Sequence, residues 1–159
     1  MINSTDILKS RMEKLQRRYS ALESYKNLID KLAAEKTIYD LAVFELLAPE
    51  QKALFDAYLK RFASIQDYLG TKIFPLLLEV AGLGVPKMSE VLSSMEKEGI
   101  ITDLSQWIAL REARNNLEHD YPDELQQALV VLQYCVDNCS TLRGYYDRVL
   151  LFARRFIQA

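Results

Sequence analysis

The sequence predicts an all-α protein, an antiparallel up-and-down helical bundle of four to five main helices. Apolar residues recur with helical periodicity along most of the chain, and no sustained period-two run or hairpin dipeptide predicts a strand. Five glycines and four prolines punctuate the 159 residues, and residues 82–86 (GLGVP) form the clearest loop. We expect one domain over residues 1–159, with residues 1–47 as an N-terminal helical region packed on the bundle.

The first expected helix runs from a cap at Asp6 or Thr5 to about Glu35. Its apolar seam repeats every seven residues, with further members four positions on: Leu8, Leu15, Leu22 and Ile29, then Met12, Tyr19 and Ala33. Because four heptads are few, we favour packing within the chain's own bundle over an extended coiled coil. A short helix is expected over residues 38–47.

A long helix is expected over residues 49–81, with a kink near residues 71–72 because Pro75 removes one backbone hydrogen bond. The next helix covers residues 87–98 and ends at Gly99. Asp103 is expected to cap a helix that reaches about Asp120, and a final helix covers residues 122–156. The long helix should bury one stripe: Leu54, Tyr58, Phe62, Ile65, Leu69 and Ile73.

Composition favours a reduced, cytoplasmic protein without membrane segments. The N-terminal MINSTDILKS is polar, unlike a signal peptide, and the longest apolar run, residues 73–80, is too short to cross a bilayer. Two cysteines, Cys135 and Cys139, are no disulfide framework and too few for a zinc site, so core packing is the favoured interpretation. A net charge of −2 means that any contact with RNA must be local.

The helix ending near Asp120 has an apolar stripe that turns polar halfway along. On a helical projection Arg114 lies within about 20° of Trp107, in the middle of the apolar arc. Arg111, Asn115 and Glu118 also fall on the side expected to be buried. Two interpretations stay open: a network within the helix, pairing residues four apart, or a cleft within the chain or between two copies.

The same helix carries the octapeptide RNNLEHDY, which contains His119, the only histidine of the chain. Pro122 follows at once and disfavours helical geometry at Tyr121, so the helix should end or kink there. Glu118, Asp120 and the helix dipole should favour protonated imidazole. Arg114 and His119 diverge by about 140°, so two chains related by a two-fold axis would build a cleft better than one.

RNNLEHDY resembles the R-N-x-x-x-H-x-Y signature of the HEPN superfamily, in particular its HepT-like toxins. A turn at residues 96–101 (EKEGII) and the order of helices extend the resemblance over about residues 6–156. It implies an HEPN-like helical homodimer acting as a metal-independent RNase toxin without a cofactor. It also implies a partner, a minimal nucleotidyltransferase antitoxin of the MntA type, that silences the toxin by adding AMP to the motif tyrosine.

The resemblance assigns roles to the motif residues. Arg114 and His119 would be catalytic, Asn115 supporting, and Tyr121 the modified hydroxyl. His119 would act as general base or acid at the RNA 2′-hydroxyl or leaving oxygen, and Arg114 would stabilise phosphorane charge. Glu118 would repel phosphate unless it is neutralised, for instance by Arg111, so both join the site as supporting residues.

Two other functions remain open: a non-catalytic helper of a nucleotidyltransferase, and a plain helical interaction module. A lone histidine without clustered carboxylates predicts no metal site, and no glycine-rich loop predicts an ATP or NAD site. Basic residues are frequent in the first and last expected helices. They are interpreted either as solvent-exposed helix faces or as a surface that binds the RNA backbone. These are Lys9, Arg11, Lys14, Arg17 and Arg18, then Arg143, Arg148, Arg154 and Arg155.

Overall fold

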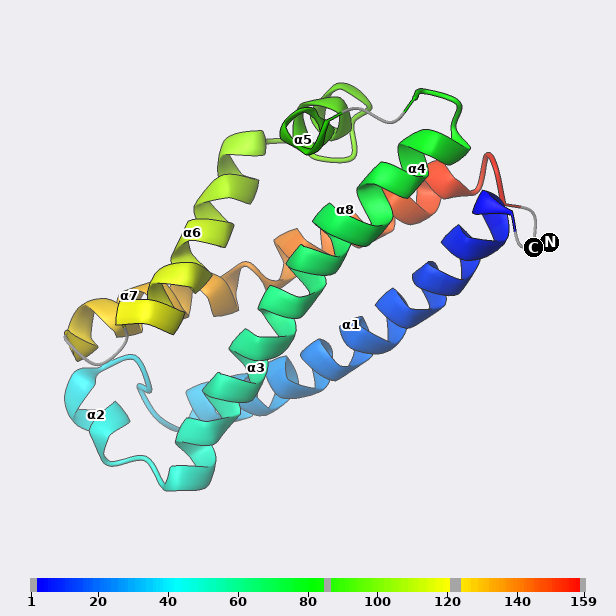
Figure 1. The fold of residues 1–159 in the computed structure, drawn as a ribbon. Coiled ribbons are helices and arrows are strands. Elements are labelled where there is room, and N and C mark those ends of the chain that lie inside the picture. The colour runs from blue at the N-terminus through cyan, green and yellow to red at the C-terminus, as the bar shows by residue number, and fades with distance from the viewer. Residues whose placement is uncertain (1–2, 85–86, 121–123, 158–159) are drawn as a thin grey trace.

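A computed structural model describes residues 3–84, 87–120 and 124–157, with the backbone alone at residues 118–120. All regular structure in these ranges is helical, which confirms the predicted all-α class. α1 lies antiparallel to α3 along its length, α6 lies on the side of α3 away from α1, and α8 runs behind the α1–α3 pair (Figure 1). The helices are α1 (Ser4–Glu35), α2 (Leu41–Glu45), α3 (Pro49–Tyr68), η1 (Leu69–Ile73), α4 (Phe74–Val80), α5 (Met88–Lys97), α6 (Leu104–Asp120), α7 (Leu125–Asp137) and α8 (Cys139–Ala153).

α1 begins slightly earlier than predicted. Its cap is Asn3, whose Oδ1 accepts a hydrogen bond from the Asp6 backbone N–H at 2.9 Å, so neither Asp6 nor Thr5 caps the helix. The predicted seam is buried except at Ala33, which is exposed, while the neighbouring Leu32 is buried. α1 therefore packs one continuous apolar face against α3.

The predicted short helix is real but reduced to α2. Asp40 caps it by accepting a hydrogen bond from the Ala42 backbone N–H at 3.0 Å, so the helix starts at Leu41. Ala48 has the extended backbone that Pro49 imposes on its predecessor, which sets the start of α3 as predicted.

The long helix is interrupted where Pro75 predicted a kink. η1 is a turn of π-helix, in which the Phe74 backbone N–H reaches back five residues to the Leu69 carbonyl. Pro75 has no N–H to give to the preceding turn, and the wider turn is the local solution. Arg11 of α1 adds a side-chain donor here, with Nη1 at 2.8 Å from the Lys72 carbonyl.

The prediction of one long final helix is wrong, because α7 and α8 are separate helices that meet at Asn138. The Asn138 amide donates to the Tyr134 carbonyl at 2.8 Å, and its oxygen accepts from Thr141 at 2.9 Å and from Gln106 of α6 at 3.4 Å. These bonds compete with helix continuation. The predicted start at Pro122 lies outside the described residues.

α5 and α6 follow the sequence closely. Gly99 ends the α5 segment with φ +79°, a left-handed conformation that glycine adopts without strain. Asp103 caps α6 by accepting from the Gln106 backbone N–H at 3.3 Å, and Glu96 accepts from the Leu104 backbone N–H at 2.9 Å. The turn at residues 96–101 is thereby tied to the start of α6.

The core is continuous and rich in aromatic residues. Trp107 of α6 is 2 % exposed, with its ring centroid 5.3 Å from Phe74 and 5.0 Å from Tyr145. Cys135 and Cys139 are buried free thiols, but they belong to two helices rather than to one. Burial raises the pKa of Cys135 to about 12. Among the described residues, no helix is both long enough and apolar enough to cross a membrane.

Candidate functional site

Among the described side chains in the polar half of the α6 stripe, Arg114 is the buried one. Arg114 is 5 % exposed, which confirms its predicted place in the apolar arc. Arg111 is exposed and Asn115 half-buried, so the expectation that both lie on a buried side is wrong for Arg111 and only partly right for Asn115. Arg111 is exposed because its side chain borders an open pocket. Arg114 is buried because α3 packs against it, with Gln66 bound to its guanidinium.

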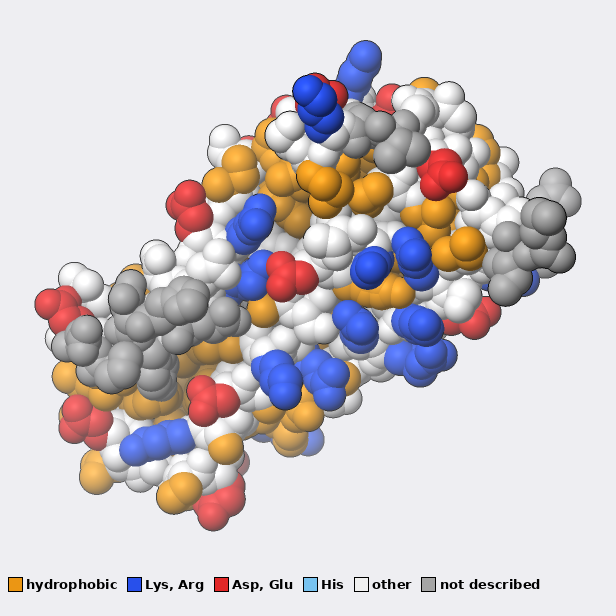
Figure 2. Space-filling view, in the orientation of Figure 1, with side chains coloured by type: hydrophobic (Ala, Val, Ile, Leu, Met, Phe, Trp, Pro, Cys, Tyr) orange, Lys and Arg blue, Asp and Glu red, His pale blue; other side chains and the backbone are white. Residues whose placement is uncertain are grey.

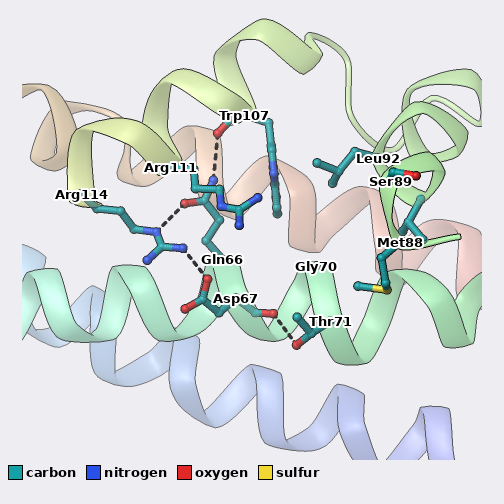
Figure 3. Close-up of a pocket in the computed structure, with 11 residues that line it drawn as sticks. Gln66, Asp67, Gly70, Thr71, Met88, Ser89, Leu92, Trp107, Arg111 and Arg114 are labelled. Carbon is teal, nitrogen blue, oxygen red and sulfur yellow. Dashed lines mark hydrogen bonds and ion pairs between the residues drawn. The ribbon is translucent and has the colours of Figure 1, made fainter. Parts of the chain in front are cut away.

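Arg114 is held by two neighbouring residues of α3 (Figure 3). Its Nε donates to Gln66 Oε1 at 2.9 Å, and its Nη2 forms an ion pair with Asp67. Gln66 in turn donates from Nε2 to the Trp107 carbonyl at 3.0 Å. The pairing predicted within α6, between Arg114 and Glu118, lies outside the described residues because the Glu118 side chain does.

The two partners of Arg114 differ in environment. Gln66 is 1 % exposed, so it supplies a dry, fixed acceptor and links α3 to α6 at two points. The Asp67 side chain is 61 % exposed, so its carboxylate stays solvated and the desolvation cost of the ion pair falls mainly on Arg114. A buried guanidinium needs such partners, because an unpaired charge in an apolar interior is strongly unfavourable.

A pocket of about 300 Å³ opens beside this network. Its lining combines the apolar side chains of Trp107 and Leu92 with the polar side chains of Arg111, Arg114 and Asp67. The π-turn contributes Gly70 and Thr71 to the same hollow, a location where such turns often mark function. The pocket suits a ligand that joins a flat apolar group to an anionic group.

His119 and Tyr121 are only partly placed. His119 belongs to the last turn of α6, and its side chain is not described; Tyr121 lies outside the described residues. Five residues separate His119 from Arg114, or roughly 7.5 Å along the helix axis. The described geometry therefore joins Arg114 and Arg111 at one pocket and leaves the predicted pair of Arg114 and His119 as a prediction.

Gln66 and Asp67 are the site residues that the sequence analysis missed. A polar residue directly after Ile65 of the buried stripe was the available clue, because it falls near the buried face of α3. Their partner lies 48 and 47 positions away, so only the packing of α3 against α6 reveals the pairing. Within the described ranges, no group of three or more His, Cys, Asp or Glu side chains could hold a metal ion.

Comparison with known proteins adds no identification: no family model matches the chain, and neither curated proteins nor solved structures give a match.

Proposed function

We propose that this protein is a metal-independent endoribonuclease, the cytoplasmic toxin of a toxin–antitoxin pair. The observation that carries the proposal is the buried motif arginine. Arg114 is oriented by Gln66 and Asp67 at the wall of a pocket that also holds the exposed Arg111. A pre-oriented guanidinium, beside a second one that makes no hydrogen bond or ion pair to any described residue, suits a phosphodiester, whose charge grows as cleavage proceeds.

The chemistry that we propose uses the 2′-hydroxyl of RNA as nucleophile. His119 removes its proton, the 2′-oxygen attacks phosphorus, and the bond to the 5′-oxygen breaks, which leaves a 2′,3′-cyclic phosphate. The departing 5′-oxygen takes a proton from an imidazolium, which the second His119 of a homodimer would supply. Arg111 and Arg114 stabilise the phosphorane oxygens, while Asn115 and Glu118 support the site.

The partner in this proposal is a nucleotidyltransferase antitoxin of the MntA type. It would transfer AMP to the Tyr121 hydroxyl, two residues after His119. The added phosphate would carry negative charge into the site and would compete with the RNA phosphate for Arg111 and Arg114. Tyr121→Phe should abolish this modification and preserve cleavage.

Cleavage of a fluorogenic RNA by the purified protein in excess chelator tests the proposal. We expect 2′,3′-cyclic phosphate ends, and a loss of roughly 100-fold or more in kcat for His119→Ala, typical of a general acid–base residue. Undiminished cleavage by His119→Ala would contradict the assignment. Unchanged helical circular dichroism separates a catalytic effect from unfolding.

One observation favours a second function, a non-catalytic helper of a nucleotidyltransferase. The ion pair with Asp67 occupies part of the Arg114 guanidinium, as in an arginine that holds two helices together. In that case the protein would cleave no RNA, and it would instead increase nucleotide transfer by the purified nucleotidyltransferase onto an acceptor. The same preparation, assayed for both reactions, distinguishes the two functions.

A further inference from the structure

A second hollow lies on the other side of Asp67 and Thr71, between α1 and the η1 turn. It encloses about 580 Å³, and we name it the α1 groove. Figure 2 shows Lys and Arg side chains gathered over this face of α1 and α3–η1–α4. The basic residues that line the groove are Arg11, Lys14, Arg18 and Lys72.

The basic residues of the groove come together by helical spacing. Arg11, Lys14 and Arg18 are three, four and seven residues apart on α1, so they share one face. Lys72 joins them from the π-turn of the antiparallel neighbour. Asp67 is the one acidic residue among those that line the groove, and it is paired with Arg114. The groove is therefore strongly cationic in a chain whose net charge is −2.

Two of the four cations are held in place. The Arg18 guanidinium lies 4.2 Å from the centroid of the Tyr68 ring and donates to Ser64 Oγ at 3.1 Å. Arg11 donates to the Lys72 carbonyl. The side chains of Lys14 and Lys72 are exposed and make no hydrogen bond or ion pair to any described residue. The groove thus combines oriented guanidinium groups with two solvated ammonium groups.

We propose that the α1 groove binds the sugar–phosphate backbone of single-stranded RNA outside the point of cleavage. This inference rests on the proposed function, and it adds a second contact region to it. Asp67 and Thr71 line both the α1 groove and the pocket beside Arg114, so one strand can pass from the pocket over this ridge into the groove. The groove supplies affinity without reading sequence, because phosphate contacts are the same for every base.

An RNA strand fits the groove better than a membrane surface does. Peripheral binding to anionic lipid combines basic residues with exposed apolar side chains that enter the bilayer. The aromatic residue of the groove, Tyr68, is buried beneath Arg18, and the remaining lining is polar or basic. A concave, polar, cationic surface instead matches grooves that track a nucleic-acid backbone.

Lys14→Gln/Lys72→Gln tests the groove against a control of equal charge, Lys9→Gln/Lys31→Gln. All four lysines are exposed, and the control pair lies on α1 outside the groove. Anisotropy of a labelled oligouridine, titrated at several salt concentrations, measures binding. With about 0.7 counterions released per phosphate contact, losing two contacts lowers the salt slope by about 1.4 and affinity by roughly tenfold or more near 0.1 M salt.

The control variant should bind within about twofold of the wild type, because its charges lie outside the groove. Equal losses in both variants, or no loss in either, would overturn the proposal. Binding of phosphatidylserine vesicles that depends on Lys14 and Lys72, without oligouridine binding, would overturn it in favour of a membrane contact.

A dinucleotide substrate keeps this inference distinct from the proposed function. UpA is too short to fill both the pocket and the groove, so Lys14→Gln/Lys72→Gln should cleave it at the wild-type rate while its KM for a longer RNA rises roughly tenfold. If this variant cleaves RNA and binds oligouridine as tightly as the wild type, the groove proposal is refuted and the nuclease proposal stands. If oligouridine binding depends on the groove but the wild type cleaves no RNA, the nuclease proposal is refuted and the groove proposal stands.

Discussion

Replacing Gln66 should destabilise the protein far more than replacing Asp67, although both bind the same guanidinium. Gln66→Leu keeps a similar volume but removes the acceptor of Arg114 Nε at 2.9 Å and the donor to the Trp107 carbonyl at 3.0 Å. The buried Nε–H is then left without its partner. Asp67→Asn, by contrast, alters a side chain that is 61 % exposed.

The expected magnitudes follow from these environments. A buried hydrogen bond to a charged group, with its donor then left unsatisfied, is worth about 2–4 kcal/mol for Gln66→Leu. Asp67→Asn changes only the exposed partner of the ion pair and keeps an oxygen that can accept from Arg114 Nη2, so we expect a cost of about 0.2–1 kcal/mol. With a urea dependence of roughly 2 kcal/mol/M, the midpoints should fall by about 1–2 M and by less than about 0.5 M.

Urea denaturation followed by helical circular dichroism measures both variants. Gln133→Leu, at an exposed position of α7, is the control for adding an apolar side chain and should change stability by less than about 0.5 kcal/mol. Adding Arg114→Met to Gln66→Leu should recover part of the loss, because both polar partners are then removed together. A midpoint for Asp67→Asn at or below that of Gln66→Leu would refute the reasoning.

Three further predictions concern the core and the first cap. Burial raises the pKa of Cys135 from 9.0 to about 12, so titration of this thiol leaves the free energy of unfolding unchanged below pH 9 and lowers it between pH 9 and 12. Cys135→Ala should flatten that fall in denaturation curves recorded across this pH range. Neither Cys135 nor Cys139 should react with a thiol reagent in the native protein, whereas both should react in denaturant; native reactivity would contradict their burial. Asn3→Ala should cost about 1 kcal/mol by removing the cap of α1, and Thr5→Ala much less, as thermal unfolding would measure.

Helix ends that depend on local chemistry were predictable from the sequence. Asp103 caps α6, Gly99 adopts its left-handed turn, and Pro75 marks the interruption of the long helix, because each acts within a few residues of itself. The break between α7 and α8 was not predictable in this way. Asn138 is held partly by Gln106, 32 positions earlier, and no glycine or proline stands at the break.

In the candidate site, too, the features that depend on local sequence were predictable and those that depend on packing between helices were not. Helical projection alone places Arg114 in the apolar arc of α6, and the structure confirms its burial. Its partners Gln66 and Asp67 depend on how α3 packs against α6, which no local pattern in either segment encodes. Arg111 is exposed for the matching reason, because the projection cannot distinguish a face covered by a helix from one that borders a hollow.

The π-turn also has a consequence for chain length. A π-helical turn holds one residue more than the α-helical turn it replaces, so residues 69–73 amount to a one-residue insertion in a long helix. A related chain that lacks both Pro75 and one residue of this segment should run through as a continuous α-helix. The pocket wall formed by Gly70 and Thr71 would then change shape even if the remaining residues were the same. A difference in the length of this helix, rather than in its residue types, would therefore mark the loss of the pocket.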